Sequence, residues 1–190
     1  FQYADDKLKA DKKFVLAVIR QEGRALRYSD DKFKTDKGVV LIAVKQAGTA
    51  LRHADKKLQA DKEVVLAAVK ESGSALEYAD KKLQADKEVV LAAVKQNGWA
   101  FEYASDKIKN DKVFVLKCIK NKIKILEYVS LNLKKDKEVV YNSVKNHGSE
   151  LRYADDIFEK DKELVLIAVV TDWSVYSWAD KKLQIDKDVL

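Results

Sequence analysis

Residues 61–85 read DKEVVLAAVKESGSALEYADKKLQA, and the ten residues that follow them, 86–95, repeat the first ten of that stretch. The opening Asp-Lys pair recurs every 25 residues without an insertion, at Asp11, Asp36, Asp61, Asp86, Asp111, Asp136, Asp161 and Asp186. Self-similarity at a fixed period is the signature of a repeat architecture. The sequence therefore predicts a single repeat array over residues 1–190, with units starting at 11, 36, 61, 86, 111, 136 and 161 and partial units at 1–10 and 186–190.

Within each unit the apolar spacing predicts two short helices joined by a tight turn. Asp61 is of the N-cap type, and Lys70 lies where a cation stabilises the carboxyl end of a helix. Gly73 is expected to end this helix in the left-handed conformation. Ser74 and Glu77 have the spacing of a capping box, which predicts that a second helix starts there at once.

One further short turn is expected in each unit, with Asp80 as its cap and Leu83 pointing inward. Neither short helix can bury its apolar face alone, whereas stacked neighbouring units can, and this is the physics of a solenoid. We therefore predict an all-α fold, a right-handed α-solenoid of 25-residue two-helix repeats.

Composition excludes several classes of protein. The chain has 190 residues, of which 47% are hydrophobic and 36% charged, and it has no proline, so general disorder and collagen-like structure are excluded. Its apolar runs are too short to span a membrane. No signal peptide is recognisable at the start, and one cysteine cannot form an internal disulfide. Because the chain starts without methionine and ends abruptly at residues 188–190, we expect a fragment of a longer protein.

Residues 86–105, DKEVVLAAVKQNGWAFEYAS, resemble the tandem helical repeat known as domain of unknown function 4116. The resemblance extends over essentially the whole chain, but Ile123 and Trp173 replace the glycine of the pattern and leave two turns open. It implies large multi-repeat proteins of protists and secreted effectors of intracellular bacteria, with no known activity, cofactor or catalytic residue. The compartment is undefined; we expect a soluble protein, cytoplasmic or, if an effector, secreted into a host cell.

No catalytic arrangement is recognisable, and we predict that the protein is not an enzyme and uses no cofactor or metal. His53 stands where other units have a tyrosine, which favours a packing role. Cys118 stands where Ala68 and Ala93 lie on the buried face, which favours an inert core thiol. The carboxylates recur as caps and as charges on helix faces, so the repeat itself explains them.

Two rows of side chains recur along the array. Tyrosines in successive units could form a platform for base stacking, although packing between repeats is the stronger interpretation. Lysines follow the capping aspartates and recur near the helix ends, where a solvated face with nearby acids explains them. Lysine outnumbers arginine by 32 to 5, which favours solubility over the bidentate contacts that arginine makes with phosphates.

Charge is concentrated in the unit at 111–135, which has seven lysines and two acids, a net charge of +5, against +6 for the whole chain. Its candidate binding residues are Lys117, Lys120, Lys122 and Lys124. The same unit lacks the turn glycine. A cluster of charge found in one repeat and not in the others is a candidate binding patch. The alternative is neutral sequence drift in that one repeat.

Two tryptophans are the remaining candidates for partner binding. Trp99 stands at a position that we expect to hold a Ser or Thr cap, and tryptophan is enriched in binding hot spots. Trp173 replaces a turn glycine, and packing against whatever follows Leu190 is its alternative explanation.

The leading functional hypothesis is a non-catalytic scaffold for protein–protein interaction or assembly within a larger protein. Two alternatives stay open. One is polyanion binding, to nucleic acid or an acidic membrane surface, through the unit 111–135; the other is a passive structural spacer. Incomplete repeats at both ends also allow end-to-end assembly.

Overall fold

The computed structural model describes residues 1–178, and in them it contains helices and turns and no β-strand. The helices recur in units of 25 residues, so the predicted all-α repeat fold is confirmed. Its right-handed winding stays a prediction, and the partial unit 186–190 lies outside the described residues. Residue contacts divide the chain into two compact units, residues 1–105 and residues from 106 onward, and each is described by itself.

Each repeat begins with an α-helix of nine or ten residues. In chain order these are α2 (Lys12–Gln21), α4 (Lys37–Gln46), α6 (Lys62–Glu71), α8 (Lys87–Gln96), α10 (Lys112–Lys120), α12 (Lys137–Asn146) and α13 (Lys162–Thr171). The predicted cap is confirmed: Oδ1 of Asp61 accepts hydrogen bonds from the backbone N–H groups of Glu63 and Val64, at 3.0 and 3.2 Å.

The second helix of each repeat is a 3₁₀ helix. These are η1 (Gly23–Tyr28), η2 (Gly48–His53), η3 (Gly73–Tyr78), η4 (Gly98–Tyr103), η5 (Leu126–Tyr128), η6 (Gly148–Tyr153) and η8 (Trp173–Trp178). The predicted capping box was wrong, because η3 starts one residue earlier than Ser74, with Ser72 in the N-cap position and no side-chain cap bond.

A third, short helix closes each of the six repeats between residues 11 and 160, where the sequence predicted one further turn. These are α3 (Asp31–Lys34), α5 (Lys56–Gln59), α7 (Lys81–Gln84), α9 (Asp106–Lys109), α11 (Leu131–Lys134) and the 3₁₀ helix η7 (Asp156–Lys160), with α1 (Asp6–Ala10) ahead of the first full repeat. Asp80 caps α7 through a hydrogen bond from the Lys82 N–H at 2.9 Å, and Leu83 is buried, as expected.

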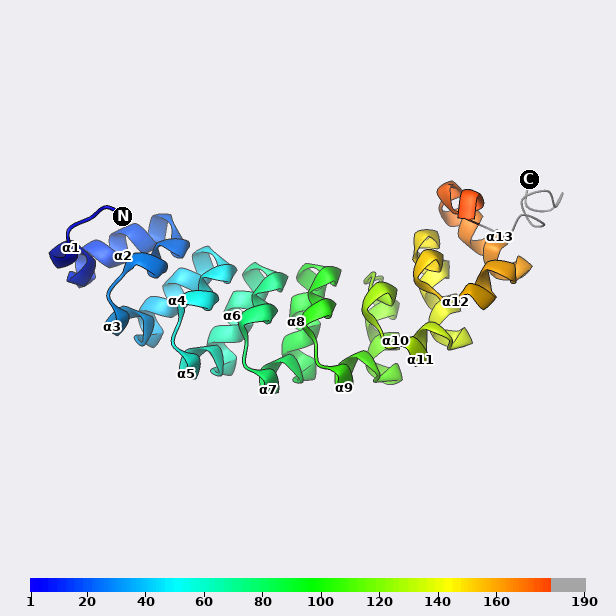
Figure 1. The fold of residues 1–190 in the computed structure, drawn as a ribbon, viewed down its shortest axis with the longest axis horizontal. Helices are drawn as coiled ribbons and strands as arrows, with labels where there is room; N and C mark the ends of the chain where they lie inside the picture. The colour runs from blue at the N-terminus through cyan, green and yellow to red at the C-terminus, as the bar shows by residue number, and fades with distance from the viewer. Residues whose placement is uncertain (179–190) are drawn as a thin grey trace. The chain divides into compact units, whose positions relative to one another are not determined.

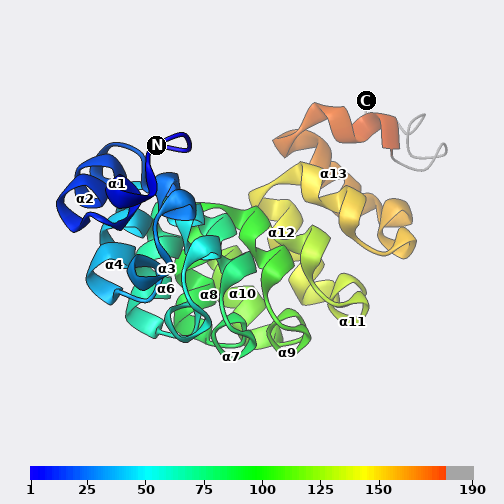
Figure 2. The ribbon, with the colours of Figure 1, turned by 60° about the vertical axis from the view of Figure 1, so that its left-hand side comes forward.

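In the first unit the long helices α2, α4, α6 and α8 lie side by side in chain order, and the 3₁₀ helices form a second row beside them (Figure 1). The turned view in Figure 2 shows the same order of α4, α6 and α8. In the second unit, α12 packs between α10 and α13. Apolar residues at equivalent positions of the repeats form the core, with Ser143 as a polar exception: Val65, Ala68, Val69 and Leu76, for instance, are fully buried.

The turn glycine has a different role from the one that the sequence suggested. In the described residues no glycine has a positive φ, so the predicted left-handed helix stop was wrong. A Cβ atom on Gly73 would lie 2.6 Å from the carbonyl oxygen of Ala93 in the next repeat. The Gly73 N–H also donates to Oε1 of Gln96, at 2.7 Å. Glycine is needed here because the next helix passes directly over this backbone.

In four repeats the lysine after the capping aspartate forms an ion pair with the capping aspartate of the next repeat. Nζ of Lys37 lies 2.7 Å from Oδ2 of Asp61 and 2.8 Å from Oε2 of Glu63. Equivalent lysine–aspartate pairs join Lys12 to Asp36, Lys62 to Asp86 and Lys112 to Asp136, each at 2.8 Å. Much of the predicted lysine row is therefore an inter-repeat ion-pair ladder.

This ladder predicts loss of stability in acid. The lysine hydrogen bond is the main cause that holds the pKa of Asp36 and of Asp61 below the ordinary carboxyl value. A lowered folded-state pKa contributes stability that is present above the unfolded pKa of about 3.9 and lost as the pH falls through the folded value. We therefore expect the melting temperature to fall between pH 5 and pH 2, and to fall less for Lys37→Met. Equal melting temperatures at pH 5 and pH 2 would contradict this.

Candidate binding surfaces

Trp99 is the second residue of η4, and its side chain is 71% exposed. The expectation that it replaces a helix cap was wrong. The cap is Asn97, whose Oδ1 accepts the Trp99 backbone N–H at 3.1 Å. The tryptophan therefore causes no loss of capping, and its ring lies on the exposed edge of the 3₁₀ row with its backbone already satisfied.

Trp173 is the first residue of η8 and is 61% exposed. Its ring stacks on Tyr176 of the same helix, with the ring centres 5.0 Å apart and the planes 6° from parallel. Here the repeat pattern survives the loss of glycine, since α13 and η8 keep their usual lengths.

The four candidate lysines of the basic repeat are all exposed. Lys117 and Lys120 are three residues apart on α10 and share one face of that helix. Lys122 lies in the turn after α10 and has a φ of 58°, while Lys124 lies just before η5. None of the four forms an ion pair within residues 1–178. They belong to the second unit, whereas Trp99 belongs to the first.

The turn that carries Lys122 departs from the repeat pattern, as the missing glycine suggested. The 3₁₀ helix η5 has only three residues, so the N–H groups of Ile125 and Leu126 lose the usual partners within the turn. Glu150, which is 3% exposed, replaces those partners from the next repeat. Its Oε2 accepts Ile125 N–H at 3.1 Å, Leu126 N–H at 2.9 Å and the Ser143 hydroxyl at 3.1 Å.

Sequence reasoning missed Glu150. A signal for it was present, because the equivalent residues in four other repeats are alanines: Ala25, Ala50, Ala75 and Ala100. A carboxylate in a core alanine position is costly unless it is hydrogen-bonded, so it points to backbone groups nearby that need an acceptor.

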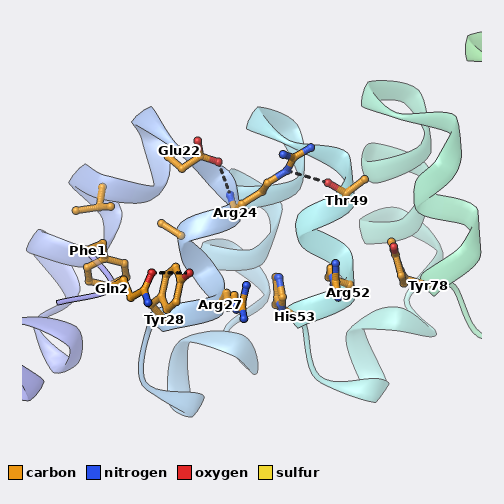
Figure 3. A pocket seen from close by; sticks show the side chains of 12 residues that line it. Phe1, Gln2, Glu22, Arg24, Arg27, Tyr28, Thr49, Arg52, His53 and Tyr78 are labelled. Atoms are coloured by element: carbon orange, nitrogen blue, oxygen red, sulfur yellow. Dashed lines mark hydrogen bonds between the residues drawn. The ribbon is translucent and has the colours of Figure 1, made fainter. Parts of the chain in front are cut away.

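A cavity of about 690 Å³ opens beside η1 and η2 in the first unit. Its lining includes Arg24 and Arg27 from η1 and Arg52 from η2 (Figure 3). These are three of only five arginines in the chain. Sequence reasoning missed this site because it weighed the total of arginines against lysines, and not where the arginines lie within the repeat.

Two of these arginines lie over tyrosine rings. The Arg27 guanidinium carbon is 5.2 Å from the centre of the Tyr28 ring, and that of Arg52 is 5.6 Å from the centre of the Tyr78 ring. The predicted tyrosine row is thus half-buried at Tyr28 and Tyr78, with cations against the rings, whereas Tyr3 is 94% exposed. In the last repeat Trp178 stands at the equivalent position, and its side chain lies outside the described part of the structure.

His53 lies between Arg27 and Arg52 in this wall of the cavity (Figure 3). Burial lowers the pKa of its imidazole below the ordinary value, and the charges of Arg52, Arg27 and Lys34 lower it further. Both effects favour the neutral form of the ring. The sequence predicted a packing role for His53 and gave no sign that it lines a cavity together with three arginines.

Other chemistry-bearing residues lie apart from these surfaces. Cys118 is fully buried on α10, in agreement with its predicted place in the core. Within residues 1–178, no three His, Cys, Asp or Glu side chains gather in a cluster that could bind a metal ion. Nor does any helix in that part of the chain combine the length and apolarity that a membrane span requires.

Comparison with known proteins gives a single kind of match. The family model described as "Domain of unknown function (DUF4116)" matches five times in tandem, at residues 1–34, 36–84, 86–134, 114–159 and 136–184. No curated protein and no solved structure matches the chain.

Proposed function

The chain belongs to the DUF4116 family of tandem helical repeats, and from that premise we propose that it is a non-catalytic scaffold that binds a protein partner through the exposed edge of its 3₁₀ helices. The observation that carries this proposal is the exposure of Trp99, 71%, at a position with no local structural need for an aromatic ring. Exposed tryptophans dominate binding hot spots, because a large rigid ring buries much area on binding and loses little entropy.

Trp99→Ser is the decisive variant, since Ser74 and Ser149 occupy the equivalent positions. We expect partner affinity to fall at least about tenfold, because hot-spot truncations cost about 2 kcal/mol or more. The free energy of unfolding should change by less than about 0.5 kcal/mol, as for other exposed positions. Affinity is measured by calorimetric titration with a partner first captured from a cell lysate.

Val113→Ser is the matched control, because Val113 is also apolar and 77% exposed but lies on the α-helix α10 and not on a 3₁₀ helix. It should leave the affinity unchanged. A partner that binds the Trp99→Ser variant as tightly as the parent chain would refute the role of this edge.

The unpaired lysines Lys117, Lys120, Lys122 and Lys124 support a second candidate, polyanion binding by the second unit. Capture of partners from a cell lysate distinguishes protein binding from polyanion binding when it is repeated with nuclease and at low and high salt. Phosphate neutralisation releases counterions, so binding of nucleic acid or anionic lipid weakens steeply as salt rises. A protein partner held at the tryptophan edge should survive both treatments.

A further inference from the structure

We propose that the cavity beside η1 and η2 binds a small anion that carries at least two phosphate groups. This site lies at η1 and η2, whereas Trp99 lies on η4, and it does not depend on the scaffold function. The charge of the cavity, the placement of its guanidinium groups beside tyrosine rings, its volume and its departure from the repeat pattern support this assignment.

The lining of the cavity has a net positive charge, with three arginines against one carboxylate. Within the described residues neither Arg27 nor Arg52 forms an ion pair. Arg24 donates from Nε to the Thr49 hydroxyl, at 3.2 Å, which leaves its charge unneutralised as well. Glu22 is the one carboxylate in the lining, and its Oε1 accepts the backbone N–H of Arg24, at 3.2 Å. A ligand that balances three guanidinium groups beside one carboxylate needs at least two negative charges.

The guanidinium groups are held in a way that suits phosphate. The guanidinium carbons of Arg27 and Arg52 lie 5.2 and 5.6 Å from the centres of tyrosine rings, so a cation–π contact helps to hold each group in place. A planar guanidinium donates two parallel hydrogen bonds to a phosphate or a carboxylate. A phosphate has the higher charge and three terminal oxygens, so it can be shared by two arginines on successive repeats, which a planar carboxylate does less well.

The volume indicates more than one phosphate group. Ligand-binding cavities measure roughly 300–1,000 Å³, and this one measures about 690 Å³. A single phosphate would leave most of that space empty. A diphosphate group fits better, whether free or attached to an organic moiety such as a nucleoside, which the rims of Tyr28 and Tyr78 could contact.

The cations here are not a requirement of the repeat. The positions equivalent to Arg27 and Arg52 in the next three repeats are Glu77, Glu102 and Glu127, so the charge there is reversed. Likewise His53 replaces the tyrosine of its neighbours. Arginine returns at this position only in Arg152, so the repeat fold forms with either charge there, and the arginines of the first two repeats are available to bind a ligand.

The test is calorimetric titration of the whole chain with inorganic pyrophosphate at 0.15 M salt. We expect Arg27→Gln and Arg52→Gln each to weaken binding at least about tenfold, the size of one lost charge-assisted pair. Arg20→Gln is the matched control, because Arg20 is an exposed arginine of the same unit outside the cavity, and it should change affinity less than twofold. Arg52→Lys, which keeps the charge but not the fork, should give an intermediate affinity.

Several results would overturn the proposal. These are an absence of pyrophosphate binding at millimolar concentration, unchanged affinity in both glutamine variants, an equal loss in Arg20→Gln, or citrate binding as tightly as pyrophosphate. Circular dichroism checks that each variant is folded. If a glutamine variant does not fold, the affinity of Arg52→Lys for pyrophosphate is the deciding measurement, and an affinity equal to that of the parent chain would count against the proposal. Tighter binding of ADP than of pyrophosphate would identify a nucleoside diphosphate, and equal binding would identify the diphosphate group alone as the ligand.

Discussion

Gly73→Ala should lower the free energy of unfolding by about 3 kcal/mol or more, because the added methyl group overlaps the backbone of the next repeat. Its Cβ would lie 2.6 Å from the Ala93 carbonyl oxygen, 3.0 Å from Oε1 of Gln96 and 3.2 Å from the Ala100 Cβ atom. The first of these atoms is main chain within α8 and cannot move without shifting that helix. Chemical denaturation, followed by circular dichroism at 222 nm, measures the change.

Gly38→Ala is the matched control in the same unit. Gly38 lies in the first turn of α4, where an added Cβ would meet only a side-chain atom, Oδ1 of Asp36, at 3.2 Å. Alanine also favours the helix by roughly 0.5–1 kcal/mol over glycine, so the net effect should be small. If the two variants were equally stable, the close approach of neighbouring repeats at Gly73 would be wrong.

This glycine shows where sequence reasoning stops. The 25-residue period, the aspartate caps and the buried apolar positions were predictable, because they follow from local helix chemistry and from comparing repeats within one chain. Gly73 was correctly identified as a special position, but for the wrong reason. Its constraint comes from a carbonyl group 20 residues away in the sequence, and no local pattern reports such a contact.

The candidate sites divide in the same way. Exposure of Trp99 and of the lysines in the basic repeat agrees with their being departures from the pattern. The arginine cavity was missed because its members come from two repeats and meet only when those repeats stack. Arg27 and Arg52 are each unremarkable as single residues, and their position beside His53 is a property of the assembled array (Figure 3).

Glu150→Ala should lower the free energy of unfolding by about 2–4 kcal/mol, although alanine is the residue that the repeat pattern favours at this position. In other repeats alanine suffices because the preceding turn bonds itself: the Ala75 N–H donates to the Ser72 carbonyl at 2.9 Å. Around Ile123 that turn is broken, and the carboxylate of Glu150 accepts two backbone N–H groups in its place. Removing it leaves buried donors without an acceptor.

Glu150→Gln separates this account from a simple packing effect. Glutamine fills the same volume and keeps one acceptor oxygen, so it should cost less than half as much as alanine. Hydrogen exchange of the Ile125 and Leu126 amides should speed up strongly in Glu150→Ala and modestly in Glu150→Gln. An alanine variant as stable as the parent chain would mean that the repeat pattern, and not the carboxylate, determines stability here. A destabilised alanine variant would show that the Glu150 carboxylate allows the turn with Lys122 and Lys124 to depart from the repeat pattern and stay ordered.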